Sequence, residues 1–230
     1  MHEPGLSEIP LFPLPNVVLF PEVSVPLFIF EPRYRAMVRE SLAADRKIGM
    51  VAVRPEAGDE IAGNPPVFEI GCEGTLSHAE EEPDGTWKIL LTATRRFRIV
   101  EETHRPEERP YRTAQIEGLP EEEPPEASDE RAALRGEVLQ SLRMIGSRTL
   151  AGESRKEVQR RAEALRKLED FDDGRFVNVV AQAIEMGVLE KQQLLEAAGS
   201  VPRYRILDSL LRFRLTELDA GPVTASGILH

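Results

Sequence analysis

The stretch that decides the fold is IPLFPLPNVVLFPEVSVPLFIFEPRYR, residues 9–35, where apolar residues and prolines lie side by side. Each proline lacks an amide hydrogen and has a fixed φ, so neither a helix nor an uninterrupted central strand is expected here. The prolines concerned are Pro10, Pro13, Pro15, Pro21 and Pro26. The pattern predicts short strands at 9–12 and 17–20 around a rigid corner, and an extended piece at 23–30 that Pro26 places at an edge or a bulge.

A helix is expected to follow at once. In Glu31-Pro32 the carboxylate suits the N-terminal end of a helix, and proline is tolerated at the first helical position. The apolar face of this helix would consist of Tyr34, Met37, Val38 and Leu42.

The following 80 or so residues read as further strands. We expect a buried strand at 48–54, a hairpin with arms at 67–77 and 87–100 that turns at Asp84-Gly85, and a last strand at 111–118. Glu80 to Glu82 would form a solvated tip. Because the helices that a parallel sheet needs are missing, these strands favour a curled, partly closed barrel.

Beyond residue 118 the sequence changes character. Residues 119–130 are acidic and rich in proline, which predicts a linker. Residues 131–220 then carry helical periodicity, with helices expected at 129–148, from Ser154 through a capping-box pattern with Glu157, and at about 172–186, 190–198 and 202–219. The sequence thus predicts an α+β protein: a β domain at 1–118, the linker, a helical bundle at 131–220 and a tail at 221–230.

Two stretches resemble a known family, the Lon protease N-terminal (LON substrate-binding) domain. LFPLPNVVLFPEVSVPLFIFEPRYR is similar to the opening of that domain, and IGCEGTLSHAEEEPDGTWKILLTATRRFRIVEE at 70–102 is similar to its second part. FVNVVA and EKQQLLE, between 171 and 218, resemble its helical part. The resemblance implies a PUA-like β pseudo-barrel with one helix, followed by a helical bundle, and a role in binding polypeptides.

Composition and charge narrow the function classes. The chain of 230 residues has a formal net charge of −11 and is acidic in both halves, which disfavours general binding to nucleic acids or anionic membranes. No apolar run approaches the length of a membrane helix, and the start lacks the pattern of a signal peptide, so the cytoplasm is the expected compartment. Cys72, the only cysteine, excludes an internal disulfide.

The search for catalytic motifs is negative. The sequence contains no GxxxxGK[ST] phosphate loop, no HEXXH and no CXXC, and its histidines have no metal-ligand spacing. We therefore expect no catalytic residues, no metal, no cofactor and no ATP binding. The resemblance to Lon enzymes carries over binding and not cleavage, because their catalytic residues have no matching positions here.

The candidate binding residues are the aromatic residues of the N-terminal half, together with one from the hairpin: Phe12, Phe20, Phe28, Phe30, Tyr34 and Trp87. Considered individually, an aromatic residue of this kind more often belongs to the core than to a binding groove. As a set they are dense enough to leave an apolar patch exposed, beside strand edges that can pair with an extended peptide. We therefore expect a non-catalytic module that recognises unfolded or apolar protein segments or a protein partner.

Two alternatives stay open. Arg95, Arg96 and Arg98 around Phe97 could form the basic strip of a PUA-like RNA-binding module, although a strand with solvated charges explains them as well. The acidic loops, with His78 beside Glu80 to Glu82, could belong to a hydrolase for a small substrate, but a solvated loop is the simpler interpretation.

Overall fold

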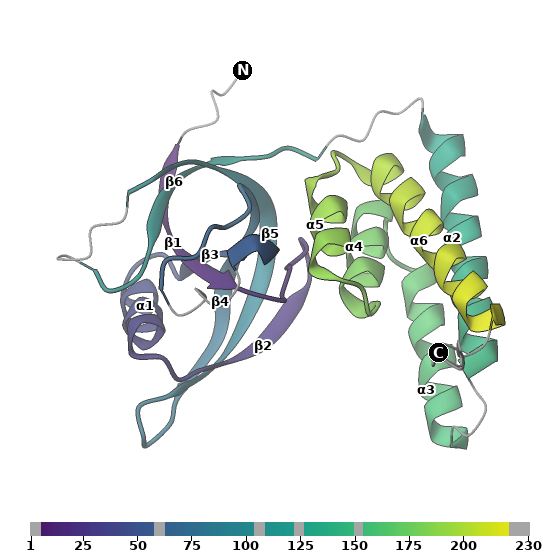
Figure 1. Ribbon diagram of the computed structural model, residues 1–230. Coiled ribbons are helices and arrows are strands. Elements are labelled where there is room, and N and C mark those ends of the chain that lie inside the picture. Colours follow the sequence, from purple (N-terminus) through teal and green to yellow (C-terminus); the bar gives the residue numbers. More distant parts are fainter. Residues whose placement is uncertain (1–5, 58–62, 104–108, 122–126, 150–153, 221–230) are drawn as a thin grey trace, which may run out of the picture. The chain divides into compact units, whose positions relative to one another are not determined.

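The computed structural model describes residues 6–57, 63–103, 109–121, 127–149 and 154–220. An N-terminal β part is followed by helices, as the sequence predicts (Figure 1). The elements in order are β1 Ser7–Leu14, β2 Ser24–Ile29, α1 Pro32–Ala43, β3 Lys47–Ala52, a 3-10 turn Pro55–Ala57, β4 Ile70–Glu81, β5 Trp87–Glu102, β6 Thr113–Gly118, α2 Ser128–Thr149, α3 Arg155–Glu169, α4 Asp173–Ala183, α5 Val188–Glu196 and α6 Ser200–Ala220.

The chain divides into two compact units. Unit 1 consists of Met1–Glu121 together with Asn178–Ala197, and unit 2 of Glu122–Val177 together with Ala198–His230. The C-terminal half of α4 and all of α5 therefore pack with the strands. The predicted linker lies partly outside the described residues, at 122–126, and the predicted domain limits stay a prediction.

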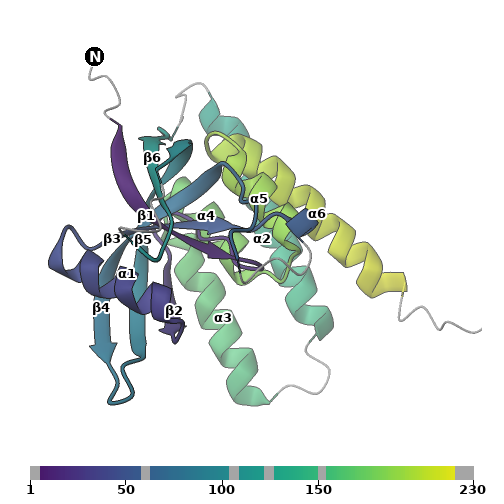
Figure 2. The ribbon, with the colours of Figure 1, turned by 60° about the vertical axis from the view of Figure 1, so that its left-hand side comes forward.

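The strands of unit 1 form a sheet that closes on itself. Their order is β2-β5-β4-β3-β1-β6, and β6 also pairs with β5, so five strands form a ring and β2 is added at its side. Only β1 and β3 run parallel. This is the barrel that the sequence predicts. Helix α1 lies beside the β4–β5 hairpin in both ribbon views (Figure 2).

The start of the barrel corrects one prediction. Strand β1 runs through Pro10 and Pro13 between β3 and β6, whereas residues 17–20 form no strand. The amide of Leu11 donates to the carbonyl of Arg112, on the side of β6. Because main-chain groups alternate in direction along a strand, the amides of odd-numbered residues in β1 face β6 and those of even-numbered residues face β3. The paired residues of β1 and β6 end at Pro10, with the Leu11 amide as the last bond on that side, and pairing with β3 begins at Leu11. Each proline therefore directs its missing donor to a side where no neighbour is paired.

Helix α1 follows the sequence prediction closely. Glu31 is its N-cap and Pro32 its first residue. Its buried residues are Tyr34, Met37, Val38 and Ser41, with Leu42 partly buried against the same core. Burial of this face holds α1 on the barrel, because most helical stability comes from packing of an apolar face.

The hairpin of β4 and β5 is longer than predicted. Glu80 and Glu81 belong to β4 and not to a loop, and the reversal is made by Asp84-Gly85, where Gly85 has a φ of 79°. Gly71 is required for another reason: a Cβ there would lie 2.5 Å from the carbonyl oxygen of Met50. The register of β4 with β5 shifts between Glu73 and Gly74, as at a β-bulge.

Unit 2 is helical and is held by buried apolar and polar contacts. Helices α2 and α6 pack together, with Val138, Leu207 and Leu211 buried. The guanidinium of Arg135 donates to the carbonyls of Leu168, Glu169 and Phe171 at the end of α3. Ser154 and Glu157 form the predicted capping box at the start of α3.

Candidate functional site

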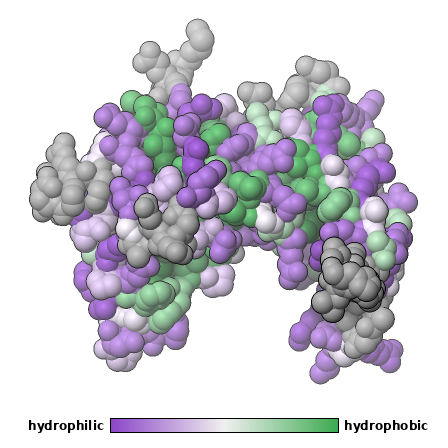
Figure 3. Space-filling model, viewed as in Figure 1, coloured by the Kyte–Doolittle hydropathy of each residue, from purple (hydrophilic) through white to green (hydrophobic). Residues whose placement is uncertain are grey.

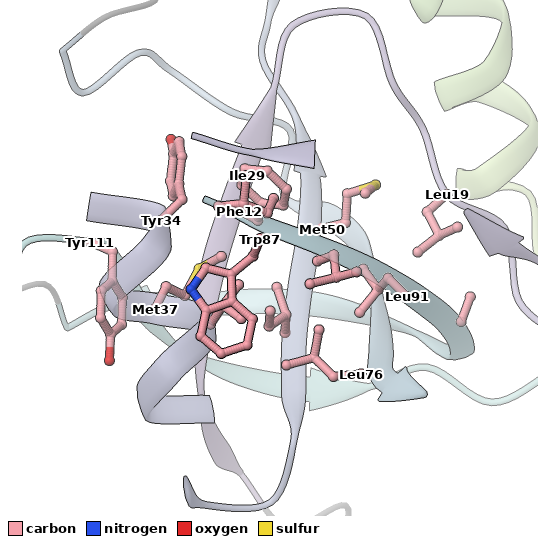
Figure 4. Close-up of a cluster of buried hydrophobic side chains, with 14 of the residues drawn as sticks. Phe12, Leu19, Ile29, Tyr34, Met37, Met50, Leu76, Trp87, Leu91 and Tyr111 are labelled. Atoms are coloured by element: carbon pink, nitrogen blue, oxygen red, sulfur yellow. The ribbon is translucent and has the colours of Figure 1, made fainter. Parts of the chain in front are cut away.

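The six predicted binding residues divide into two groups. Four of them lie in the interior of unit 1, with exposed fractions between 0% and 8%: Phe12, Phe20, Tyr34 and Trp87. Figure 4 shows three of these in the barrel core, where the rings of Phe12 and Tyr34 meet edge to face with centroids 4.7 Å apart. Burial is also the first cause of the raised pKa of the Tyr34 phenol. These four side chains contribute stability and are not available to a partner.

The other two lie on the surface. Phe28 is 54% exposed and Phe30 is 63% exposed, and their ring centroids are 6.4 Å apart. Phe28 lies in β2 and Phe30 directly follows the strand, and both are exposed while Ile29 between them is buried. We call these two residues the β2 aromatic pair. Figure 3 shows apolar surface on the part of unit 1 where Figure 1 places β2.

An open hollow of about 450 Å³ adjoins Phe28. Its other lining residues come from the hairpin end: Glu82, Pro83, Asp84, Thr86 and Lys88. The ammonium of Lys88 lies 2.5 Å from Glu82, and this hydrogen bond raises the pKa of Lys88. Asp84 accepts hydrogen bonds from the side chain and the amide of Thr86, which lower the pKa of its carboxyl group. Both shifts favour the charged forms of Lys88 and Asp84.

The three arginines around Phe97 do not form one surface. Arg96 is only 2% exposed and donates to the carbonyls of Leu195 and Ala197 at the end of α5. Arg95 is ion-paired with Glu73, whose side chain also binds Lys47. The side chain of Arg98 is exposed, and it forms no hydrogen bond or ion pair with a residue in the described part of the chain. Of the three arginines only Arg95 and Arg98 are exposed, so the basic strip that RNA recognition would need lacks its central residue.

Cys72 and His78, the other two residues considered for a chemical role, lie in surroundings that indicate no such role. Cys72 is buried, with its sulfur 3.3 Å from the carbonyl oxygen of Arg95. His78 is exposed on β4. Among the residues that the structure describes, no group of His, Cys, Asp or Glu is arranged to hold a metal ion. None of the described helices is long and apolar enough to cross a membrane.

Sequence reasoning missed two features of unit 1. It did not single out the hollow beside Phe28, although the pattern of strand pairing aligns Phe28 with Lys88. It also placed all of the helical residues beyond the linker in one bundle. The polar pattern of Gln182 and Gln192 was the available signal, because both amides bond to the main chain of unit 1, at Phe20 and Ile70.

Comparison with known proteins identifies relatives. The family model for the "ATP-dependent protease La (LON) substrate-binding domain" matches residues 8–212. The Lon protease of Trichlorobacter lovleyi is 31% identical over 206 residues, which are 88% of this chain and 23% of that protein. The Lon protease of Parabacteroides distasonis is 29% identical over 93% of this chain and 25% of its own length. The chain thus spans about a quarter of the length of these relatives.

Solved structures with the same fold are also N-terminal domains of Lon. The N-terminal domain of Mycobacterium avium complex Lon protease matches with a TM-score of 0.64 at 17% identity, covering 90% of this chain and 98% of that one. The Lon N-terminal domain protein from Xanthomonas campestris matches with a TM-score of 0.57 at 20% identity and the same coverage. The family match extends over most of the residues that build both units, and we conclude that the chain belongs to the LON substrate-binding domain family.

Proposed function

We propose that this chain is a non-catalytic recognition module that binds unfolded or apolar segments of polypeptides, or a protein partner, in the cytoplasm and in the service of proteolysis or protein quality control. The observation that carries the proposal is the β2 aromatic pair, two adjacent phenylalanine rings more than half exposed on a sheet edge. Neighbouring exposed apolar side chains of this size favour association with an apolar partner.

The family supports the same reading, since the matching model describes a substrate-binding domain and not a catalytic one. The sequence itself carries no phosphate loop and none of the catalytic positions of a Ser/Lys peptidase. RNA recognition is the weaker alternative, because Arg96 is committed to the end of α5 and Arg95 to Glu73.

The test is a comparison of two probes at two salt concentrations. A labelled, permanently unfolded polypeptide and a single-stranded RNA of mixed sequence are each titrated with the purified chain by fluorescence anisotropy. Binding through apolar burial should change little with salt, whereas RNA binding should weaken with a log–log slope of roughly −0.7 per phosphate contact.

The variant that tests the site is Phe28→Ser combined with Phe30→Ser. Losing one buried phenylalanine contact corresponds to about a tenfold loss of affinity or more, so the double variant should bind the polypeptide at least that much more weakly. Phe213→Ser is the matched control, because Phe213 on α6 is 62% exposed but lies in unit 2. Unchanged polypeptide binding by the double variant, or RNA binding with a steep salt slope that is lost in Arg95→Ala with Arg98→Ala, would reject the proposal.

A further inference from the structure

Strand β2 lies at one end of the sheet and pairs with a single neighbour. Its partner is β5, in antiparallel register from Ser24 with Thr92 to Ile29 with Trp87. The opposite side of β2 faces no other strand of the described chain. An edge of this kind offers a row of main-chain groups for pairing with another extended chain.

The direction of each main-chain group follows from one hydrogen bond. The amide of Ala93 donates to the carbonyl of Val23, 2.8 Å away, so Val23 directs its carbonyl toward β5. Because main-chain groups alternate along a strand, positions 25, 27 and 29 also face β5, and positions 24, 26 and 28 face outward. We call the outward main-chain groups of Ser24, Pro26 and Phe28 the β2 free edge.

The β2 free edge has two donors and three acceptors. The donors are the amides of Ser24 and Phe28, and the acceptors are the carbonyls of Ser24, Pro26 and Phe28. None of these groups bonds to another residue in the part of the chain that the structure describes. Pro26 removes the central donor, which discourages pairing along the whole edge with an identical chain but leaves both ends usable.

The same three residues present their side chains on the outer face, so an added strand would lie next to Phe28. Neighbouring strands are about 4.8 Å apart, and Lys88 lies one strand beyond Phe28 on the other side. Only a long side chain can therefore cross the Phe28 ring and enter the hollow.

The charges of the hollow favour a cation as the occupant. Lys88 is neutralised by Glu82, whereas Asp84 forms no ion pair with any described residue. Arg35 lies close to Gly85, and its positive charge contributes to the lowered pKa of Asp84, but no ion pair within hydrogen-bond distance joins Arg35 to Asp84. The aromatic face of Phe28 adds an attraction for a cation that passes over it.

We propose that the β2 free edge takes up an extended polypeptide segment as an additional strand, and that the hollow beside Phe28 accepts a lysine or arginine side chain of that segment. The inference rests on the proposed polypeptide recognition and specifies its binding mode and its residue preference. Apolar contact with the β2 aromatic pair, main-chain pairing and one basic side chain then act together.

The first experiment uses peptides and the unmodified full chain. The probe is a labelled peptide of about ten residues that alternates valine and serine around a central arginine, a length that covers one strand. One version is N-methylated at odd-numbered amides and the other at even-numbered amides. In an added strand one of these two sets faces away from β2, and the version with that set blocked should bind about as well as the parent. The other set donates to β2, and blocking it should weaken binding about threefold to tenfold per lost bond. Replacing the central arginine with glutamate should weaken binding, and replacing it with norleucine should weaken it less.

The second experiment removes a donor from the protein. Ser24→Pro deletes an amide that faces away from β5, so the fold should persist while peptide affinity falls about threefold to tenfold. Ser24→Ala is the matched control, because it keeps the amide and loses only the hydroxyl that bonds to Thr92. Asp84→Asn should abolish the preference for arginine over norleucine without changing the binding of the norleucine peptide. A thermal melt of each variant checks folding, and the N-methylated peptides test pairing even where a variant fails to fold.

The outcomes separate this inference from the function on which it rests. Equal binding by both N-methylated peptides would overturn strand addition, while loss of binding in the Phe28→Ser, Phe30→Ser variant would still support polypeptide recognition. No binding of any peptide by the folded chain would reject both. A concentration-dependent dimer in analytical ultracentrifugation that dissociates in Ser24→Pro would assign the edge to a second copy of the chain, and would overturn the proposed occupant.

Discussion

Arg96 on β5 donates a hydrogen bond from Nη1 to the main-chain carbonyl of Leu195, at 3.0 Å, and so joins the barrel to the end of α5 across 99 positions of sequence. The same guanidinium donates to the carbonyls of Ala197 and Pro120 and forms an ion pair with Glu121. The last carbonyls of a helix have no partner within it, and a buried arginine supplies the donors here.

Arg96→Met should therefore destabilise the chain by about 2–4 kcal/mol, because it leaves several buried carbonyls without donors. Arg98→Met is the matched control on the same strand. Arg98 is exposed, and its replacement should change the free energy of unfolding by no more than about 0.5 kcal/mol. Urea unfolding followed by Trp87 fluorescence measures both, and equal midpoints for the two variants would contradict the role given to Arg96.

Truncation tests whether 178–197 is part of the barrel's cooperative unit. A fragment of residues 1–121 lacks the amides of Gln182 and Gln192 and the carbonyls that Arg96 binds. We expect thermal unfolding of this fragment, followed by Trp87 fluorescence, to have a lower midpoint temperature than that of the full chain, or to lose its cooperativity. A fragment of 1–197 keeps these partners and should melt close to the full chain. A 1–121 fragment with an unchanged melt would show that the strands need no helical residues.

Limited proteolysis addresses the chain boundary in a different way. We expect the first cleavage within about 118–130, where the acidic, proline-rich composition cannot contribute to a core. Mass spectrometry of the early fragments locates the cut. Cleavage inside 70–100 before any cut at the expected boundary would be inconsistent with the predicted domain limits.

Much of the fold follows from local chemistry in the sequence. Glu31-Pro32 starts α1, Asp84-Gly85 turns the hairpin and Ser154 with Glu157 caps α3, because each depends on residues close together in the chain. The prediction for β1 was wrong at Pro10 and Pro13, because a strand tolerates a proline only where the neighbouring strand is not paired on the side of the missing amide. Which strand is paired at each position depends on residues far away in the sequence.

The candidate site was less predictable for the same reason. Exposure of Phe28 and burial of Phe20 depend on long-range packing, and both residues lie in equally apolar surroundings in the sequence. The assignment of Arg96 to α5 joins residues about a hundred positions apart, which no spacing rule for a strand or a helix connects.

Alkaline pH should destabilise the chain through its tyrosines. Burial is the first cause of the raised pKa of Tyr111, whose hydroxyl also donates to Glu40 at 2.5 Å, and burial likewise raises the pKa of Tyr34. Tyrosines in the unfolded chain ionise near the ordinary value of 10.0, whereas these two stay protonated in the folded state. The stabilisation is thus complete below pH 10 and decreases as the pH rises above it. Thermal melts from pH 8 to pH 11 should show a smaller decrease for Tyr111→Phe than for the unmodified chain, and an equal decrease would mean that Tyr111 ionises freely when folded.

The contrast between Phe20 and Phe28 separates stability from recognition. Phe20 is fully buried, so Phe20→Asp places a carboxylate in the interior and should unfold the chain or lower its stability by more than about 4 kcal/mol. Phe28 is 54% exposed, and Phe28→Asp should leave the melting temperature within a few degrees of the unmodified chain. Polypeptide binding should nevertheless fall in Phe28→Asp, because the new charge replaces an apolar contact beside Asp84. Circular dichroism melts and anisotropy titrations of the same preparations measure the two effects, and a folded Phe28→Asp that binds the unfolded polypeptide normally would remove Phe28 from the site.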